Sequence, residues 1–228
     1  MTESARLQVE ACVDSLESAR TARVAGATRI ELCAALDVGG TTPPPELLAS
    51  CIEHVDVPVH VMIRPRGGDF LYDAAELRGM RDAIERARSA GAAALVLGLL
   101  DGRGKVDVER TRELVEFARP LPVTFHRAID TARDLREALD DVVATGAARV
   151  LTSGGAATAA AGIPRLAALV AAAGDAIVVM AGGGVRAPNV ARIVKRTGVR
   201  EVHARCDPAE PGAFASLVAA AAALGLSG

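Results

Sequence analysis

The chain has 228 residues, half of them hydrophobic, which is enough to bury the core of one large domain. The net charge is −2 with both signs interspersed, and there is no Trp, one Tyr and four Phe, so we expect no nucleic-acid partner. The apolar runs are too short to span a bilayer, and Met1–Ser4 lacks the basic and apolar regions of a secretion signal. We therefore expect a cytoplasmic protein with no membrane partner. The four cysteines are far apart with no CxxC pair, and in a cytosolic chain we expect them to be reduced thiols.

Alternation of aliphatic and polar residues predicts eight strands along the chain. They are residues 7–13, 29–33, 59–64, 94–98, 123–127, 149–153, 177–181 and 201–205. Helical spacing fills the segments between them, with capping-box patterns in which Asp replaces the usual Ser or Thr. These patterns are Asp14–Glu17, Asp73–Glu76 and Asp134–Glu137. Pro188 suits the first turn of a helix that runs to about Thr197.

A weak repeat recurs before every second predicted strand. Each copy begins with a glycine that can end a helix in the left-handed conformation; the copies start at Gly26, Gly91, Gly146 and Gly198. A repeating unit of two strands and two helices predicts a single-domain (β/α)8 TIM-type barrel over residues 1–228. The alternative is an open doubly wound sheet, which is disfavoured because no GxGxxG follows the first strand.

Strand parity predicts which side chains point into the barrel. The inward set is Glu10, Cys12, Glu31, Cys33, His60, Met62, Arg64, Thr124, His126, Glu201, His203 and Arg205. This interior is far more polar than the aliphatic layers that usually fill such a barrel. Because unpaired buried charges are costly, we expect these groups to pair with one another or to hold water or a ligand.

Glu10 and Glu31 lie on adjacent predicted strands and have two interpretations. They are suited to act as an acid/base pair or as metal ligands. Alternatively, they neutralise Arg64, Arg66 or Arg127 in internal salt bridges.

His60 and His126 also have two interpretations. At predicted strand ends among charges, they are candidates for proton shuttles or metal ligands; otherwise they are satisfied core residues. Asp69 and Asp130, in the loops after the third and fifth strands, would orient an arginine or a substrate hydroxyl, or cap a helix.

Two glycine-rich turns, which follow the sixth and seventh predicted strands, predict an anion site. Glycine allows backbone N–H groups to converge on an oxyanion, although such loops are also simply tight turns. The residues predicted to bind a small anionic ligand are Arg64, Arg66, Arg127, Ser153, Gly154, Gly155, Gly183, Gly184 and His203.

Cys12 and Cys33 each follow a glutamate by two residues, which predicts equivalent heights on neighbouring strands. With Met62 nearby they would form a sulfur set suited to Cu(I). The alternative is two small buried side chains, since free cysteine is commonly buried. Cys51, on a predicted helix, and Cys206, in a predicted loop, receive no role.

Together these segments resemble the CutC family of copper-homeostasis proteins. The resemblance covers residues 7 to 205 and rests on EAC at 10–12, IELC at 30–33, GGTTP at 39–43, HVMIRPRGGDF at 60–70, TFHRAID at 124–130, LTSGG at 151–155, GGGVR at 182–186 and EVH at 201–203. It implies a TIM-type barrel, a cytoplasmic location and Cu(I) binding at Cys12 and Cys33. The chain departs from the family at Ala204-Arg205, where serine-containing residues are expected.

Two functions follow as hypotheses. The first is copper homeostasis by Cu(I) binding. The second is an enzyme with lyase- or isomerase-like acid/base chemistry on a small anionic or phosphorylated metabolite, or a module that senses such a metabolite. The Ala-rich helices are suited to pack in a homodimer, although no residue pattern specifies one.

Overall fold

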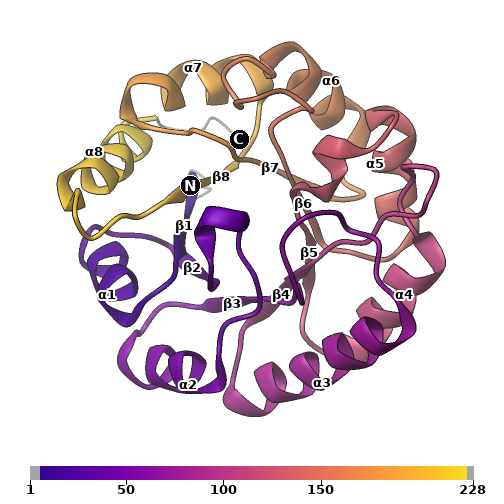
Figure 1. The fold of residues 1–228 in the computed structure, drawn as a ribbon. Helices are drawn as coiled ribbons and strands as arrows, with labels where there is room; N and C mark the ends of the chain where they lie inside the picture. The colour runs from indigo at the N-terminus through magenta and orange to yellow at the C-terminus, as the bar shows by residue number, and fades with distance from the viewer. Residues whose placement is uncertain (1–5, 225–228) are drawn as a thin grey trace.

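Eight parallel strands form a closed barrel in the computed structural model, which describes residues 6–224 (Figure 1). The strands are β1 (Gln8–Val13), β2 (Arg29–Leu32), β3 (Val59–Met62), β4 (Ala94–Leu97), β5 (Val123–Phe125), β6 (Arg149–Thr152), β7 (Val178–Ala181) and β8 (Glu201–Arg205). They pair in chain order, and β8 pairs with β1 to close the barrel. The predicted (β/α)8 fold is confirmed.

The helices form a ring around the barrel (Figure 1). They are α1 (Leu16–Val24), α2 (Pro45–His54), α3 (Ala74–Ala90), α4 (Val108–Ala118), α5 (Leu135–Ala144), α6 (Ile163–Ala173), α7 (Ala187–Thr197) and α8 (Pro211–Ala222), with two short 3₁₀ helices, η1 (Leu36–Val38) and η2 (Arg127–Thr131). No helix within residues 6–224 is both long and apolar enough to cross a bilayer. Met1–Ser4, on which the expectation of no secretion signal rests, lie outside the described residues.

All eight predicted strands are present, and the largest differences are at the ends of β3 and β5. β3 stops at Met62 rather than Arg64. β5 stops at Phe125 rather than Arg127, where η2 begins. The reason is His126, whose Nδ1 accepts a hydrogen bond from the Ala128 N–H and so caps η2. The chain therefore turns at the residue that was predicted to lie within the strand.

The first predicted capping box is displaced by one residue. The N-cap of α1 is Ser15, and its reciprocal partner is Ser18, rather than the predicted pair Asp14 and Glu17. Both serine hydroxyls take part, since the Ser15 hydroxyl accepts from the Ser18 N–H and the Ser18 hydroxyl accepts from the Ser15 N–H. Serine and aspartate are comparably good N-caps, so residue type alone does not decide between the two neighbouring positions.

The other predicted helix signals are found at their expected positions. Asp73 and Glu76 form a reciprocal capping box on α3. Asp134 caps α5, but Glu137 pairs with basic side chains instead of completing the box. Pro188 lies in the first turn of α7. The four repeat glycines all have positive φ, between +77° and +95°, as the sequence pattern predicted.

Two hydrophobic regions follow from strand parity. Outward residues such as Val9, Ala11 and Val13 belong to the large core between the sheet and the helices. A second, small cluster lies inside the barrel and consists of Cys12, Cys33, Met62 and Val96, with Leu36 packed against it. The interior of the barrel therefore combines this sulfur-rich cluster with buried charges.

Candidate functional site

A cavity of about 530 Å³ lies at the mouth formed by the carboxyl ends of the strands. Active sites of this fold lie at the same end. The predicted site residues that line it are Cys12, Glu31, Arg64, His126, Arg127, Gly183, Gly184 and His203. The predicted residues outside its lining are Glu10, Cys33, His60, Arg66, Ser153, Gly154 and Gly155.

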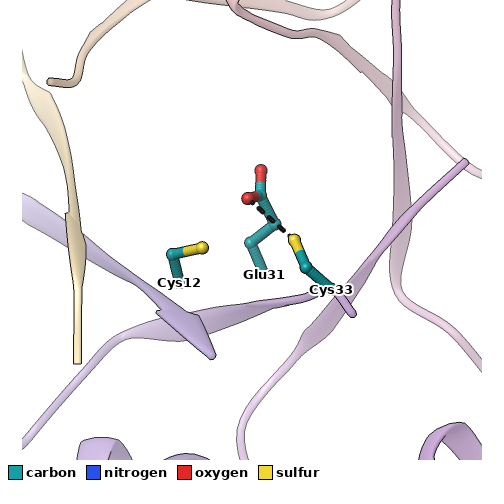
Figure 2. Close-up of side chains that lie close together, drawn as sticks. All are labelled: Cys12, Glu31 and Cys33. Carbon is teal, nitrogen blue, oxygen red and sulfur yellow. Dashed lines mark hydrogen bonds between the residues drawn. The ribbon is translucent and has the colours of Figure 1, made fainter. Parts of the chain in front are cut away.

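The two cysteines lie close together but not at equal heights. The Cα partner of Cys12 across the β1–β2 ladder is Glu31, so Cys33 is one inward position further along β2. The prediction of equivalent heights is therefore wrong. The two sulfurs and a Glu31 carboxylate oxygen nevertheless lie within 4.8 Å of one another (Figure 2). The Cys33 thiol donates a hydrogen bond to Glu31 Oε1 at 3.3 Å.

The environment of the two thiols differs in a way that makes one of them reactive. The neighbouring Cys33 thiol lowers the pKa of Cys12 to about 5, against burial, and His203 contributes in the same direction. The Cys12 sulfur is consequently a thiolate at neutral pH, the form that binds metals. The same hydrogen-bonded contact with Cys12, together with burial, raises the pKa of Cys33 well above its ordinary value.

Glu10 is a fully buried anion surrounded by donors. Its carboxylate lies 2.6 Å from Arg29 Nε, 2.9 Å from His203 Nδ1 and 3.0 Å from His60 Nδ1. Burial would raise the pKa of this carboxyl, but the hydrogen bond with His203, the close approach of His60 and the charge of Arg29 hold it well below its ordinary value. Its partners are thus Arg29 and the histidines, not the arginines predicted from the sequence.

Glu31, the second carboxylate, has the opposite character. Burial raises the pKa of Glu31 to about 8, with further increases from the nearby charges of Cys12 and Glu10. Its Oε2 has no hydrogen-bond partner among residues 6–224. His203 Nε2 lies 3.8 Å from the other oxygen. Two carboxyl groups with pKa values pushed apart are a common arrangement in acid/base catalysis.

A buried ion network below the cavity was missed in the sequence. Arg29 bonds Glu201 as well as Glu10, and Arg149 lies 3.1 Å from Glu201. The signal was available, because Arg29 has the same parity as Glu31 and so must also point inward.

The three predicted arginines have different roles. Arg64 is buried and donates to the backbone carbonyls of Val38, Gly40 and Gly68, at distances between 2.9 and 3.0 Å. Arg66 does not line the cavity. It bonds Asp69 on its own loop, the residue predicted to orient an arginine.

Arg127 is half-exposed, lines the cavity and lies 2.8 Å from the Asp130 carboxylate. That carboxylate occupies the turn after β6. It accepts hydrogen bonds from the N–H groups of Ser153 and Gly155 at 2.9 to 3.0 Å. Part of the predicted anion site thus already holds an internal anion.

The turn after β7 is different from the turn after β6. Among residues 6–224, no acceptor is found for the N–H groups of Gly183 and Gly184. Both glycines line the cavity and have positive φ, and α7 begins shortly after them. Of the two predicted anion-binding turns, this is the one whose amide donors remain free.

The absence of a side chain at Gly98, directly after β4, leaves the space that the His126 ring occupies. A Cβ at Gly98 would lie 2.6 Å from its Nδ1 and 2.7 Å from its Cε1, so only glycine leaves room for the ring. Phe70 packs against the ring with centroids 5.1 Å apart. Burial and the nearby Arg64 charge lower the pKa of His126 to about 3, so the ring is neutral at physiological pH.

Comparison with known proteins agrees with this geometry. A sequence model of the CutC family matches residues 7–207. The chain belongs to the CutC family. CutC relatives include a protein of Caulobacter vibrioides, 46% identical over 208 residues, which covers 91% of this chain and 84% of that protein. Another, from Pasteurella multocida, is 43% identical over 197 residues, or 86% of this chain and 81% of that one.

A solved CutC structure has the same fold. It is the protein of Streptococcus agalactiae, described as a copper homeostasis protein, with a TM-score of 0.82 and 36% identity. The match covers 86% of this chain and 97% of that chain. The resemblance to the CutC family found in the sequence is therefore confirmed.

Proposed function

We propose that this CutC-family protein acts in copper homeostasis by binding Cu(I) through Cys12 and Cys33. The observation that carries the proposal is the pair of sulfurs within 4.8 Å of one another inside the barrel. The description of the Streptococcus agalactiae relative as a copper homeostasis protein supports it. We place the function in the cytoplasm, where thiols stay reduced.

The donor set fits a soft monovalent ion. Thiolate and thioether sulfur select Cu(I), and Met62 belongs to the same buried cluster as the two cysteines. A metal–thiolate bond is about 2.3 Å long, so one ion can join sulfurs about 4.6 Å apart.

The backbone geometry favours an ion over a disulfide. Because Cys12 is opposite Glu31, the two cysteines are diagonal neighbours on adjacent strands. Strand spacing and rise place their Cα atoms about 8 Å apart, whereas a disulfide requires less than about 7 Å. The thiols are close enough for a bridging ion and too far apart for a bond without movement of the backbone.

The two thiols differ in whether metal binding must displace a proton. Metal binding requires deprotonated sulfur, and Cys12 is already a thiolate. Cys33 still carries its proton, which it donates to Glu31 Oε1. Because the pKa of Glu31, about 8, leaves that carboxyl protonated at neutral pH, the Cys33 proton is released to solvent when the second thiolate forms.

The test is titration of the reduced protein with Cu(I) against a competing chelator. We expect Cys12→Ser/Cys33→Ser to lose at least two orders of magnitude in affinity. Cys51→Ser is the matched control, because Cys51 is also buried but lies on α2 and does not line the cavity. Unchanged affinity in the double variant would rule out this site.

A second candidate function is an enzyme acting on a small anionic or phosphorylated metabolite. It is favoured by two carboxyl groups with opposed pKa shifts on either side of His203, below a mouth that contains Arg127 and free glycine amides. A ligand screen by thermal shift, followed by turnover assays, tests it. We expect Arg127→Gln to weaken any hit and Arg136→Gln, on the exposed face of α5, to leave it unchanged. A screen without hits would count against this function.

A further inference from the structure

His126 is a buried group of the cavity that neither proposed function uses. The residue is 4% exposed and lines the cavity. Its ring is held in one place, because Gly98 leaves room for it and the Ala128 N–H donates to Nδ1 at 3.2 Å. A side chain fixed this closely at a barrel mouth is preorganised for contact with a ligand.

The hydrogen bond from Ala128 decides which nitrogen carries the proton. Since Nδ1 is an acceptor, the neutral ring must have its hydrogen on Nε2. The low pKa of His126, about 3, keeps the ring neutral rather than doubly protonated. His126, a lining residue of the cavity, therefore carries a neutral N–H donor whose direction is set by the backbone.

Within the described range, residues 6–224, this donor has no acceptor, because no hydrogen-bond partner is found for His126 Nε2. Buried donors without partners are rare in native proteins, and each one calls for an explanation. A core histidine that served packing alone would be expected to have both nitrogens satisfied.

The surroundings of His126 determine what kind of acceptor it would take. Arg64 lies close enough to lower its pKa by charge, and Phe70 contacts both side chains, at 5.1 Å from the His126 ring and 4.9 Å from the Arg64 guanidinium. A positive field beside an N–H donor favours an oxygen that bears negative charge, full or partial. The nitrogen is enclosed, so an entering oxygen requires a neighbouring side chain to move. Phe70, which packs against the ring, lies on the irregular loop between β3 and α3.

We propose that His126 donates a hydrogen bond through Nε2 to a carbonyl or carboxylate oxygen of a small molecule bound in the mouth of the barrel. This role differs from proton transfer and from metal ligation, because the nitrogen facing the ligand keeps its proton. A neutral histidine that polarises a carbonyl is a known catalytic device in this fold. This proposal extends the second candidate function and rests on it in one respect: both require that a small molecule binds in the cavity.

The test uses the whole protein labelled with ¹⁵N-histidine, whose NMR spectrum distinguishes the two neutral tautomers and the cation. Pyruvate, acetate and inorganic phosphate are titrated separately. We expect the His126 ring to be the Nε2–H tautomer at neutral pH, and its Nε2–H resonance to shift with pyruvate or acetate. This part of the test uses the unsubstituted protein, so its outcome does not depend on whether a variant folds.

Variants then measure the hydrogen bond. We expect His126→Phe, which cannot donate, to weaken binding about tenfold to a hundredfold, and His126→Gln, which retains a donor, to weaken it less. His54→Gln is the matched control, since His54 is an exposed residue of α2. The proposal is overturned by an Nδ1–H tautomer or a cation at neutral pH, by a response to phosphate alone or to no probe, or by equal binding in His126→Phe. Copper binding is independent of these results and is tested separately by the cysteine variants.

Discussion

Removal of Arg29 is the most direct test of the buried ion network. Arg29 is 6% exposed, with its Nε 2.6 Å from Glu10 and its other contact on Glu201. Arg29→Met preserves much of the side-chain volume but leaves two buried carboxylates without this shared cation. Breaking a buried ion pair from one side costs about 3 to 5 kcal/mol, because the remaining charge is uncompensated.

The structure places the expected loss at the lower end of that range. Glu10 keeps its contacts with His60 and His203, and Glu201 keeps Arg149 at 3.1 Å. We therefore expect Arg29→Met to lower the free energy of unfolding by about 3 kcal/mol.

Urea denaturation at pH 7, followed by circular dichroism, measures this loss. Arg23→Met is the control, because Arg23 forms its ion pair with Asp56 on the surface, where solvent and salt screen the interaction and such pairs contribute little. If Arg29→Met and Arg23→Met lowered the free energy of unfolding equally, the claim that the buried ion network around Arg29 stabilises the barrel would be refuted. A loss confined to Arg29→Met would confirm it.

Three further predictions use the same denaturation assay. The pKa of His126 is about 3 in the folded state against an ordinary value of 6.5, so the unfolded state takes up this proton first as the pH is lowered. The free energy of unfolding should therefore decrease as the pH is lowered from 6.5 to 3, by up to about 1.4 kcal/mol per pH unit, and His126→Gln should remove that part of the slope. Gly98→Ala, whose methyl would overlap the His126 ring, should cost about 1 to 3 kcal/mol, whereas Gly79→Ala, in open space on α3, should stabilise by about 0.5 to 1 kcal/mol. Asp130→Asn should cost about 2 kcal/mol through the turn after β6, and Asp140→Asn, exposed on α5, should cost under about 0.5 kcal/mol.

Each of these predictions has a clear contrary result. An unchanged pH slope in His126→Gln would mean that the ring is protonated in the folded state. If Gly98→Ala were as well tolerated as Gly79→Ala, the ring would not be fixed by the missing side chain. Equal losses at Asp130 and Asp140 would mean that the internal anion does not hold its turn.

The fold was readable from the sequence because its signals are local. Each strand alternates on its own, and the repeat glycines mark helix ends without reference to the rest of the chain. Element ends were less readable, since competing hydrogen bonds decide them. His126 ends β5 by capping η2, and Ser15 replaces Asp14 as a cap, through contacts that hydrophobic periodicity does not report.

Only the part of the site that depends on strand parity, namely which side chains point into the barrel, could be predicted from the sequence. Parity placed Glu10, Cys12, Glu31 and Cys33 inside the barrel, and the structure brings them together. It could not place Cys12 opposite Glu31, because the stagger between strands is set by closure of the whole barrel. Nor could it show that Asp130 fills the turn after β6, since that contact joins side chain and backbone far apart in the chain.

The fit between Gly98 and His126 links two positions that are distant in sequence. A related chain with alanine or serine at position 98 has no space for an imidazole at position 126, so the two positions are expected to change together among relatives. A glycine at the end of the fourth strand is then a marker, readable in any relative, of whether the donor at position 126 has been retained.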